Sequence, residues 1–484
     1  MRLFIFLIVA AASLCVSSCA VPLGPGYTIE KQELGVHFVP TPELRILIEA
    51  DYQLRNTGNQ PLSLLEMRLP GRRRFHIGVS QTLWDGMALV QETSPDNPRN
   101  TSLHFPRPWK VSVRHTLHLS AEFQPTPAGE SGFSFVPDAF FLPSEGWQPE
   151  LLPSRGLFPT GGVPPDKWDL VVRVPEGFLA HTSGHAVKTS RRGGEITFRA
   201  IQRPEDRYPF VIAGRYAESR LGGGKEKVYL WSRTRVEAAS LQQATESLTR
   251  TIQGYDATFG TRAKDAQQFW IVECPVVTGC FSGRRSFYAN LLGEEGEPVS
   301  AELASLDTVM IDFSGGPPKL GAAAPSLAAS WLGYGQNPGF YEQDPPLSAL
   351  PAFAAALGHE SVEGPSFRIA TIRRALRVIP KTGESHKNED PVVLRAKSFL
   401  FFYALQDRYG QEAFRNALHH MLEARRGRGF EIADLIAAFG DETGQNVAEF
   451  VRLWMKHPGV PDEFRARYED ASTTNIASLK ETTP

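Results

Sequence analysis

Apolar and polar residues alternate along much of the first half of the chain. Clear examples are Leu44–Leu54, Trp109–Phe123 and Glu195–Ala200, which are separated by turns rich in Gly, Pro and Asn. Alternation of this kind is typical of strands with one buried and one exposed face. Because no long amphipathic helix interrupts these strands, residues 27–221 are predicted to form an antiparallel β-sandwich or saddle domain.

The pattern changes after Gly222–Lys227, a run of three glycines followed by charged residues that marks a domain boundary. Val236–Phe259 has the spacing of a long amphipathic helix, whereas Phe269–Glu273 and Leu306–Phe313 have the composition of buried strands. Strands and helices are mixed here, so residues 225–390 are predicted to form an α+β domain.

Helical periodicity continues towards the carboxyl end of the chain. Residues 411–425, 431–439 and 446–456 are each predicted to be a helix, and glycines stand at their stop positions. Together they predict a helical subdomain over residues 391–467. The polar tail, residues 470–484, is predicted to be disordered.

The first 20 residues have the pattern of a targeting segment. Arg2 supplies a positive charge, and Leu3–Leu14 is an apolar run too short for an ordinary membrane-spanning helix. The following V-S-S-C resembles a bacterial lipobox, in which Cys19 would become the lipidated first residue. The alternative is ordinary cleavage after Ala20, giving a periplasmic or secreted protein. Either reading predicts export.

The composition narrows the classes of function without identifying one. The chain has 484 residues, enough for two to four domains, and a net charge of −2, which gives no sign of a nucleic-acid partner. Of its four cysteines, Cys15 and Cys19 lie in the leader. Cys274 and Cys280 either close a small disulfide loop, which export would permit, or are two buried thiols.

A short apolar run, Ala323–Gly333 (AAPSLAASWLG), is the most informative stretch of the chain. Leu327, Ala328, Trp331 and Leu332 have helical spacing within it. A predicted strand precedes this segment, and an apolar helix, residues 347–357, is predicted to follow it.

Strand, helix, loop and helix in this order resemble the core of the M1 family of zinc aminopeptidases, the gluzincins. In that family the first helix carries HExxHxWWG and the second carries a glutamate that completes the zinc site. Trp331 and Gly333 match this pattern. The ligand positions hold residues with neither imidazole nor carboxylate, namely Pro325, Ser326 and Ala329 in the first helix and Ser348 or Ala349 in the second.

Weaker motifs follow the same family order over roughly residues 30–465. They include Gly146–Pro149 near a family W-x-P, and the segments Trp168–Pro175 and Phe210–Tyr216. Phe450, Trp454 and then Pro458–Pro461 follow in the order of the family's F-x-x-W…P-G-x-P. The resemblance implies a β-saddle domain followed by a thermolysin-like α+β domain with a carboxy-terminal helical subdomain.

Two further family positions that carry chemistry are altered. The family has a G-x-M-E-N motif whose glutamate holds the substrate's amino group. In this chain Gly279 matches the motif, but Ser282 replaces the glutamate. A glycine-rich strand end with no binding role would also account for these residues. Residues 395–405 resemble the family's helix with the motif Y-x-K-G. Lys397 matches its lysine, while Arg395 replaces the tyrosine that stabilises the oxyanion. Arg395 is expected to face solvent or form a salt bridge beside the old groove.

The retained framework and the replaced chemical positions predict an exported, catalytically inactive M1-like pseudopeptidase. Its groove would bind a peptide or a cell-envelope protein and not nucleic acid, with membrane attachment through lipid on Cys19. No cofactor is expected, although zinc is the metal of the family. The candidate groove residues are Gly279, Ser282, Pro325, Ser326, Ala329 and Arg395, of which Ser326 and Arg395 occupy catalytic positions of the family.

Two active alternatives remain open. An active zinc metallopeptidase would need other ligands, such as His359, Glu360, His386 and Glu342. His359 and the adjacent pair His419 and His420 are more simply surface or packing residues. A serine hydrolase would use Ser326 or Ser330, but no G-x-S-x-G elbow surrounds either residue.

Overall fold

The computed structural model describes most of the chain between residues 26 and 469. The described ranges are 26–69, 76–95, 97, 100–124, 134–143, 147–153, 162–202, 209–221, 227–260, 268–275, 301–305, 307–311, 327–328, 331–332, 345–380, 390–425 and 431–469. The predicted targeting segment with Cys19 and the predicted disordered tail therefore lie outside the described residues. Among the helices that the structure describes, none is long and apolar enough to cross a membrane.

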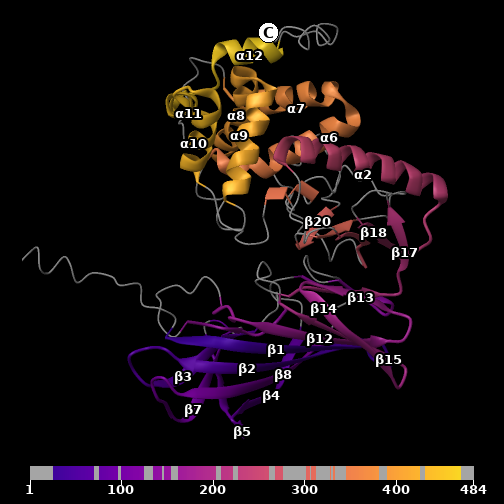
Figure 1. The fold of residues 1–484 in the computed structure, drawn as a ribbon. Coiled ribbons are helices and arrows are strands. Elements are labelled where there is room, and N and C mark those ends of the chain that lie inside the picture. Colours follow the sequence, from indigo (N-terminus) through magenta and orange to yellow (C-terminus); the bar gives the residue numbers. More distant parts are fainter. Residues whose placement is uncertain are drawn as a thin grey trace, which may run out of the picture. The chain divides into compact units, whose positions relative to one another are not determined.

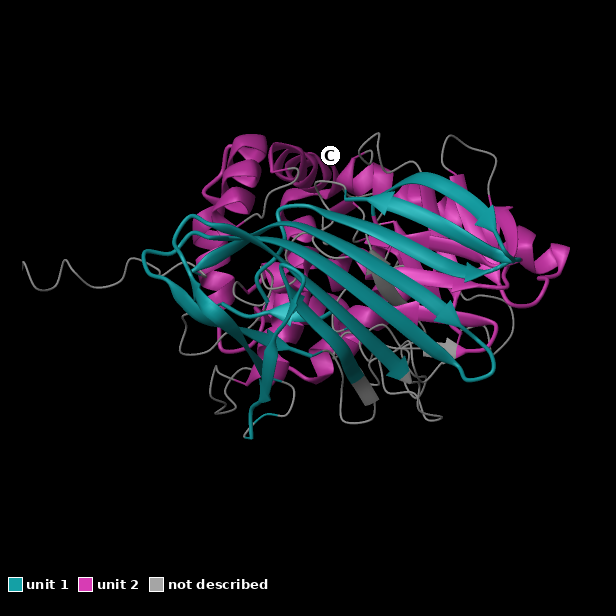
Figure 2. Cartoon of the chain, turned by 90° about the horizontal axis from the view of Figure 1, so that it is seen from below, with its two compact units in different colours: residues 1–127, 145–176, 184–202 teal, residues 128–144, 177–183, 203–484 magenta. Residues whose placement is uncertain are grey.

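The chain forms two compact units, coloured separately in Figure 2. Unit 1 comprises residues 1–127, 145–176 and 184–202, and unit 2 comprises residues 128–144, 177–183 and 203–484. This division differs from the predicted domains at 27–221, 225–390 and 391–467, because several strands before residue 221 belong to the same unit as the helices.

Unit 1 is built on an eight-stranded sheet in the order β14-β15-β12-β1-β2-β8-β4-β5 (Figure 1). Its strands are β1 (Tyr27–Val39), β2 (Arg45–Asn56), β4 (His76–Trp84), β5 (Met87–Ala88), β8 (Arg114–Gln124), β12 (Trp168–Pro175), β14 (His185–Arg192) and β15 (Glu195–Ile201). All pairs are antiparallel except β1 with β12, which is parallel.

A second, four-stranded sheet of unit 1 has the order β11-β3-β7-β6. Its strands are β3 (Leu62–Arg68), β6 (Val90–Thr93), β7 (Asn100–Trp109) and β11 (Glu150–Leu151). The predicted strand from Trp109 to Phe123 is therefore two strands, because a turn with a positive φ of 64° at Ser112 separates β7 from β8. Buried tyrosine hydroxyls secure the core, since Tyr27 donates to Leu152 O at 2.6 Å and Tyr52 to Pro149 O at 2.8 Å.

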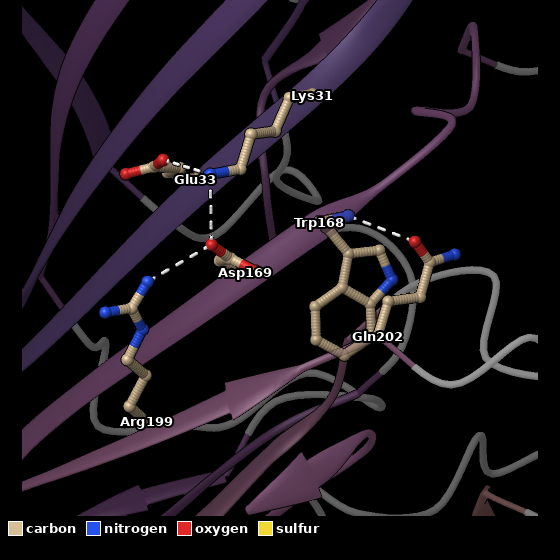
Figure 3. A network of polar contacts seen from close by, with 6 residues as sticks. All are labelled: Lys31, Glu33, Trp168, Asp169, Arg199 and Gln202. Carbon is tan, nitrogen blue, oxygen red and sulfur yellow. Dashed lines mark hydrogen bonds and ion pairs between the residues drawn. The ribbon is translucent and has the colours of Figure 1, made fainter. Parts of the chain in front are cut away.

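One face of the eight-stranded sheet carries polar side chains that pair across strands. On β1, Leu34 is buried, whereas the neighbouring Lys31 and Glu33 face outward. Lys31 Nζ contacts Glu33 and also Asp169 of β12 at 3.1 Å, and Asp169 pairs with Arg199 of β15 at 3.3 Å (Figure 3). These hydrogen bonds raise the pKa of Lys31. The alternation of apolar and polar residues in the sequence thus corresponds to strands that place apolar side chains on the core face and polar side chains on this open face.

The described residues of unit 2 form two sheets, and strands β13, β17, β18 and β20 of these sheets are labelled in Figure 1. The first, in the order β13-β16-β10-β9, is built from β9 (Ser134–Val136), β10 (Ala139–Leu142), β13 (Leu179–Thr182) and β16 (Val211–Gly214). The second, in the order β17-β18-β19-β21-β20, is built from β17 (Ala217–Leu221), β18 (Lys227–Ser232), β19 (Gln268–Glu273), β20 (Ala301–Ser305) and β21 (Thr308–Ile311). Phe141, Ile212, Trp231 and Met310 share one buried cluster, which holds the two sheets together.

The helices of unit 2 confirm the predicted periodicity. The amphipathic helix is α2 (Ala238–Phe259), and the three predicted carboxy-terminal helices are α9 (Gln411–Ala424), α10 (Ile432–Thr443) and α11 (Val447–Lys456). The others are a 3₁₀ turn η4 (Leu347–Ala349), α6 (Leu350–Glu363), α7 (Pro365–Arg377), α8 (Pro391–Tyr409) and α12 (Asp462–Glu469). Helix α8 is the central one, since it is buried on all sides from Ala396 to Gln406.

The turn between β13 and β14 provides a test of the packing in unit 1. Gly184 has a φ of +89°, and a Cβ there would overlap the carbonyl oxygen of Ile201. We expect Gly184→Ala to lower the free energy of unfolding by about 2–3 kcal/mol, from strained backbone plus overlap. Thermal unfolding followed by circular dichroism measures this loss.

Gly193 is the matched control for this change. Its φ is +63° and a Cβ there would meet nothing within 4 Å. Gly193→Ala should therefore cost only the left-handed backbone term, about 1 kcal/mol. Equal losses for the two variants would contradict the close packing of Gly184 against Ile201.

Candidate functional site

The segment that resembles the family's metal-binding helix contributes four side chains to the core of unit 2. Leu327, Ala328, Trp331 and Leu332 are all buried, in the same cluster as α2, α6 and α8. Their spacing is that of one face of a helix, as the sequence predicted. Pro325, Ser326 and Ala329, which occupy the family's ligand positions, lie outside the described residues.

Trp331, which the family pattern retains, has a structural role. Its indole Nε1 donates to Oδ1 of Asp256 at 3.0 Å, and its ring meets the edge of Tyr255 at 5.1 Å. Both partners lie on α2, so Trp331 fixes its own segment against that helix. Trp331 is thus buried, and the contacts described here are with α2.

The second helix of the family pattern corresponds to η4 and α6. Ala349 is buried and Ser348 is half-buried at the end of η4, and α6 begins at Leu350 with a proline in its first turn. Neither residue offers a carboxylate. Within the described part of the chain, no three His, Cys, Asp or Glu side chains gather where they could hold a metal ion.

A pair of reciprocal contacts joins α8 to the end of α11. The ammonium of Lys397 donates to Met455 O at 3.0 Å and also to His457 O, and the indole of Trp454 donates to Lys397 O at 3.2 Å. We call these contacts the α8–α11 clasp. A cation suits the carboxyl end of a helix, where carbonyl oxygens lack partners within the helix. Lys397 and Trp454, which match family positions in the sequence, therefore make structural contacts.

Burial changes the acid–base properties of Lys397. The residue is only 4% exposed, and desolvation lowers the pKa of its ammonium group to about 8. The oxygens of Met455 and His457 that accept from it are neutral carbonyls and not carboxylates. The protonated form of Lys397 is therefore less favoured in the folded chain than in the unfolded chain, although it makes the contacts of the clasp.

The remaining candidate groove residues are not brought together by the described structure. Arg395 lies exposed in the first turns of α8. Gly279 and Ser282 lie outside the described residues, as does Cys280. Cys274, at the end of β19, is disulfide-bonded, so the free-thiol alternative does not hold for it.

The histidines considered as alternative ligands have packing partners. His359 is buried on α6, where it stacks on Phe367 at 4.9 Å and its Nδ1 lies 3.0 Å from Oε1 of Glu363. The rings of His419 and His420 lie 6.5 Å apart on α9. His386 and Glu342 lie outside the described residues.

Sequence reasoning missed a polar contact in the interior of unit 2. Nε2 of His181, on β13, lies 2.8 Å from Oγ1 of Thr308, whose hydroxyl donates to Oδ1 of Asp307 at 2.8 Å. The imidazole stacks on Trp270 at 3.9 Å. Because 127 residues separate His181 from Thr308, no local pattern could have identified this pair.

A β-rich unit, a mixed five-stranded sheet with helices, and a carboxy-terminal helical layer define an M1 metallopeptidase-like fold. Solved structures of that class match over nearly the whole chain. A two-domain M1 zinc metallopeptidase, a mutant bound to L-arginine, matches with a TM-score of 0.57 at 18% identity, covering 91% of this chain and 96% of that one.

An M1 zinc metallopeptidase from Deinococcus radiodurans matches with a TM-score of 0.55 at 18% identity and the same coverage. A mutant from that organism bound to a Tyr-Ser-Ala substrate matches with a TM-score of 0.54 at 18% identity, again covering 91% and 96%. No protein-family model matches the chain, and no curated protein matches it. The chain thus has an M1 aminopeptidase-like fold, as the sequence motifs implied.

These comparisons correct one expectation, that no cofactor is involved. The structures with this fold are of zinc metallopeptidases, so zinc is the cofactor of the proteins that this chain resembles. The residues that the sequence motif places at the family's ligand positions do not fit zinc, because Pro325, Ser326 and Ala329 carry neither imidazole nor carboxylate. A zinc ion bound by this chain would need ligands at other positions.

The α8–α11 clasp predicts a pH dependence of stability. The pKa of Lys397 is about 8 in the folded chain and about 10.4 in an unfolded one. Between these values the unfolded chain binds more protons, so this residue's contribution to stability rises with pH through that window. In Lys397→Met the rise between pH 7.5 and pH 9.5 should disappear, as measured by urea unfolding at both values.

Lys456→Met is the matched control, because Lys456 is exposed on α11. It should keep the pH dependence of the unaltered protein. Removing the Lys397 ammonium also leaves Met455 O and His457 O without their donor, at a cost of about 1–3 kcal/mol. An unchanged pH slope in Lys397→Met would show that its ammonium is not desolvated.

Proposed function

We propose that this chain is an exported protein that uses an M1-like fold to bind a peptide or a cell-envelope protein without cleaving it. The carrying observation is a contrast between two groups of family positions. Trp331, Lys397 and Trp454 are retained, and each makes a structural contact: with Asp256 for Trp331, and within the α8–α11 clasp for the other two.

The positions that carry chemistry in the family are the altered group. In the aligned sequence a serine, Ser326, replaces the glutamate that would activate water, and Arg395 replaces the oxyanion tyrosine. If the chain had simply lost its function and accumulated random substitutions, the structural positions would be expected to change as well. Retention of the framework alone therefore supports a fold that is kept for binding.

The substitution at Ser282 bears on what the groove would recognise. A carboxylate at this position forms a charge-assisted hydrogen bond with the free amino group of a peptide, whereas a neutral hydroxyl forms a much weaker one. We propose that a bound peptide lies along a strand edge by main-chain hydrogen bonding. Recognition would then not require a free amino terminus.

The alternative is an active zinc metallopeptidase with ligands at unfamiliar positions. The observation in its favour is that the similar solved structures are of zinc metallopeptidases, one of them bound to a Tyr-Ser-Ala substrate. Hydrolysis that depends on a chelatable metal would identify it.

Tyr-Ser-Ala and N-acetyl-Tyr-Ser-Ala form a matched pair of probes. We expect the purified protein to bind both within about threefold of each other, because Ser282 supplies no charge for the free amine. We also expect no free tyrosine to be released, with or without added zinc. Isothermal calorimetry measures the binding, and mass spectrometry of the peptides measures cleavage.

An active enzyme would differ in cleavage. A preference for the free amine would report a second difference, a carboxylate other than residue 282 at the amine, and should be about tenfold or more, since a charged hydrogen bond contributes about 1.5–3 kcal/mol. Tyrosine release that stops on chelation would establish the alternative. Failure of either peptide to bind at millimolar concentration would count against a peptide-binding groove.

We also propose that Cys19 anchors the protein to a membrane. One acyl chain gives only marginal attachment, so firm retention requires the multiple acylation of a bacterial lipoprotein. Cys19→Ala should move the protein from the membrane fraction to the soluble exported fraction, as followed by fractionation and immunoblotting. A Cys15→Ala control should leave the distribution unchanged. Membrane retention of Cys19→Ala would contradict the lipobox.

A further inference from the structure

The open face of the eight-stranded sheet carries an aspartate, a histidine and a serine in one row. His118 and Ser120 are two residues apart on β8, so their side chains project from the same face. Asp51 of β2 lies directly opposite His118 in the antiparallel register. Leu117 and Leu119 alternate with them and are buried on the other face.

Hydrogen bonds connect the three side chains in a fixed order. Nδ1 of His118 lies 2.7 Å from Oδ1 of Asp51, and Nε2 lies 3.0 Å from Oγ of Ser120. A carboxylate can only accept, so Nδ1 carries the proton, and in a neutral imidazole Nε2 then has the lone pair. The Ser120 hydroxyl therefore donates to Nε2, which is the arrangement that activates a serine nucleophile.

A hydroxyl–imidazole contact described above in unit 2 has the opposite polarity. The Thr308 hydroxyl donates its proton to Asp307, so it can only accept from Nε2 of His181. That imidazole cannot remove the threonine proton. The direction of the hydrogen bonds thus distinguishes Ser120 from Thr308, although both lie beside a histidine and an aspartate.

The row on the sheet is accessible to a small reagent. The side chains of His118 and Asp51 are 29% and 60% exposed, and Ser120 is half-buried. Because the face is open, binding provides little stabilisation, and a reacting substrate has to bring a good leaving group of its own. These features fit a small activated ester and exclude an amide.

We propose that Ser120 is a nucleophile towards small activated carboxylic esters, with His118 as its general base. Oγ of Ser120 attacks the ester carbonyl carbon as its proton moves to Nε2 of His118. The bond to the leaving alcohol breaks, and His118 returns the proton to that alcohol, leaving an acyl-Ser120. Water then attacks the acyl carbonyl, His118 again takes and returns a proton, and the acid and free Ser120 are released.

Asp51 is a positioning residue in this scheme. Its carboxylate holds the Nδ1–H of His118, which fixes the tautomer and the ring orientation. Since Asp51 is largely exposed, its ion pair with the developing imidazolium is weak. Its removal should therefore slow acylation only modestly, by about fivefold or less.

A fluorophosphonate probe and p-nitrophenyl acetate test this site in the full-length protein. The probe should form a stable phosphonyl ester with Ser120, releasing fluoride, and peptide mapping by mass spectrometry locates it. Transfer of the acetyl group from p-nitrophenyl acetate to Ser120 should release p-nitrophenol, which is measured by its absorbance. His118→Gln should slow both reactions by about 100-fold, the usual contribution of a general base.

Ser80→Ala is the matched control, because the hydroxyl of Ser80 lies nearby but donates to Ser120 O at 3.2 Å. It should leave labelling unchanged, whereas Ser120→Ala should abolish it, with circular dichroism melting showing that each variant is folded. Equal labelling of the unaltered protein and His118→Gln, or adducts spread over other serines, would overturn the proposal. Asp51, His118 and Ser120 lie in unit 1 and the candidate groove residues in unit 2, so this test is independent of the proposed function.

Discussion

The contact between helices α8 and α11 of unit 2 depends on a buried cation, the ammonium of Lys397. Helix α8 is surrounded by protein from Ala396 to Gln406, and Lys397 places an ammonium within that apolar setting. Carbonyl oxygens at the end of α11 accept hydrogen bonds from this ammonium, and the indole of Trp454 donates one to the backbone of α8. The free-energy cost of burying an ammonium without hydrogen-bond partners would far exceed the gain from any one of the neighbouring apolar contacts. The end of α11 therefore supplies the hydrogen-bond acceptors that the buried ammonium of Lys397 needs in the folded chain.

The sequence predicted individual elements well, because their periodicity records which face is buried. The alternation in residues 44–54 corresponds to β2, and the helical spacing in residues 236–259 corresponds to α2. What periodicity could not specify is partnership between distant strands. The parallel pairing of β1 with β12 joins Gln32 to Trp168, and no local pattern specifies a contact over that separation.

The candidate site shows the same division between local and distant information. Family motifs identified Lys397 and Trp454 from the sequence, but their reciprocal hydrogen bonds required the folded arrangement of α8 and α11. Conversely, nothing in the sequence singled out Ser120, because its relation to Asp51 depends on strand register. A shift of one residue in the pairing of β2 with β8 would place Asp51 on the other face of the sheet, where it could not contact His118.

The interleaving of the two units along the chain has a consequence for dissection of the protein. Three short strands of the β13-β16-β10-β9 sheet come before residue 184, while β16 at Val211–Gly214 completes it. A fragment that ends at residue 202, at the last strand of unit 1, would carry β10 and β13 without the strand that lies between them. Their unpaired backbone groups would then form exposed edges, which recruit other chains. Insolubility of such a fragment would reflect an orphaned sheet and not an unstable β unit.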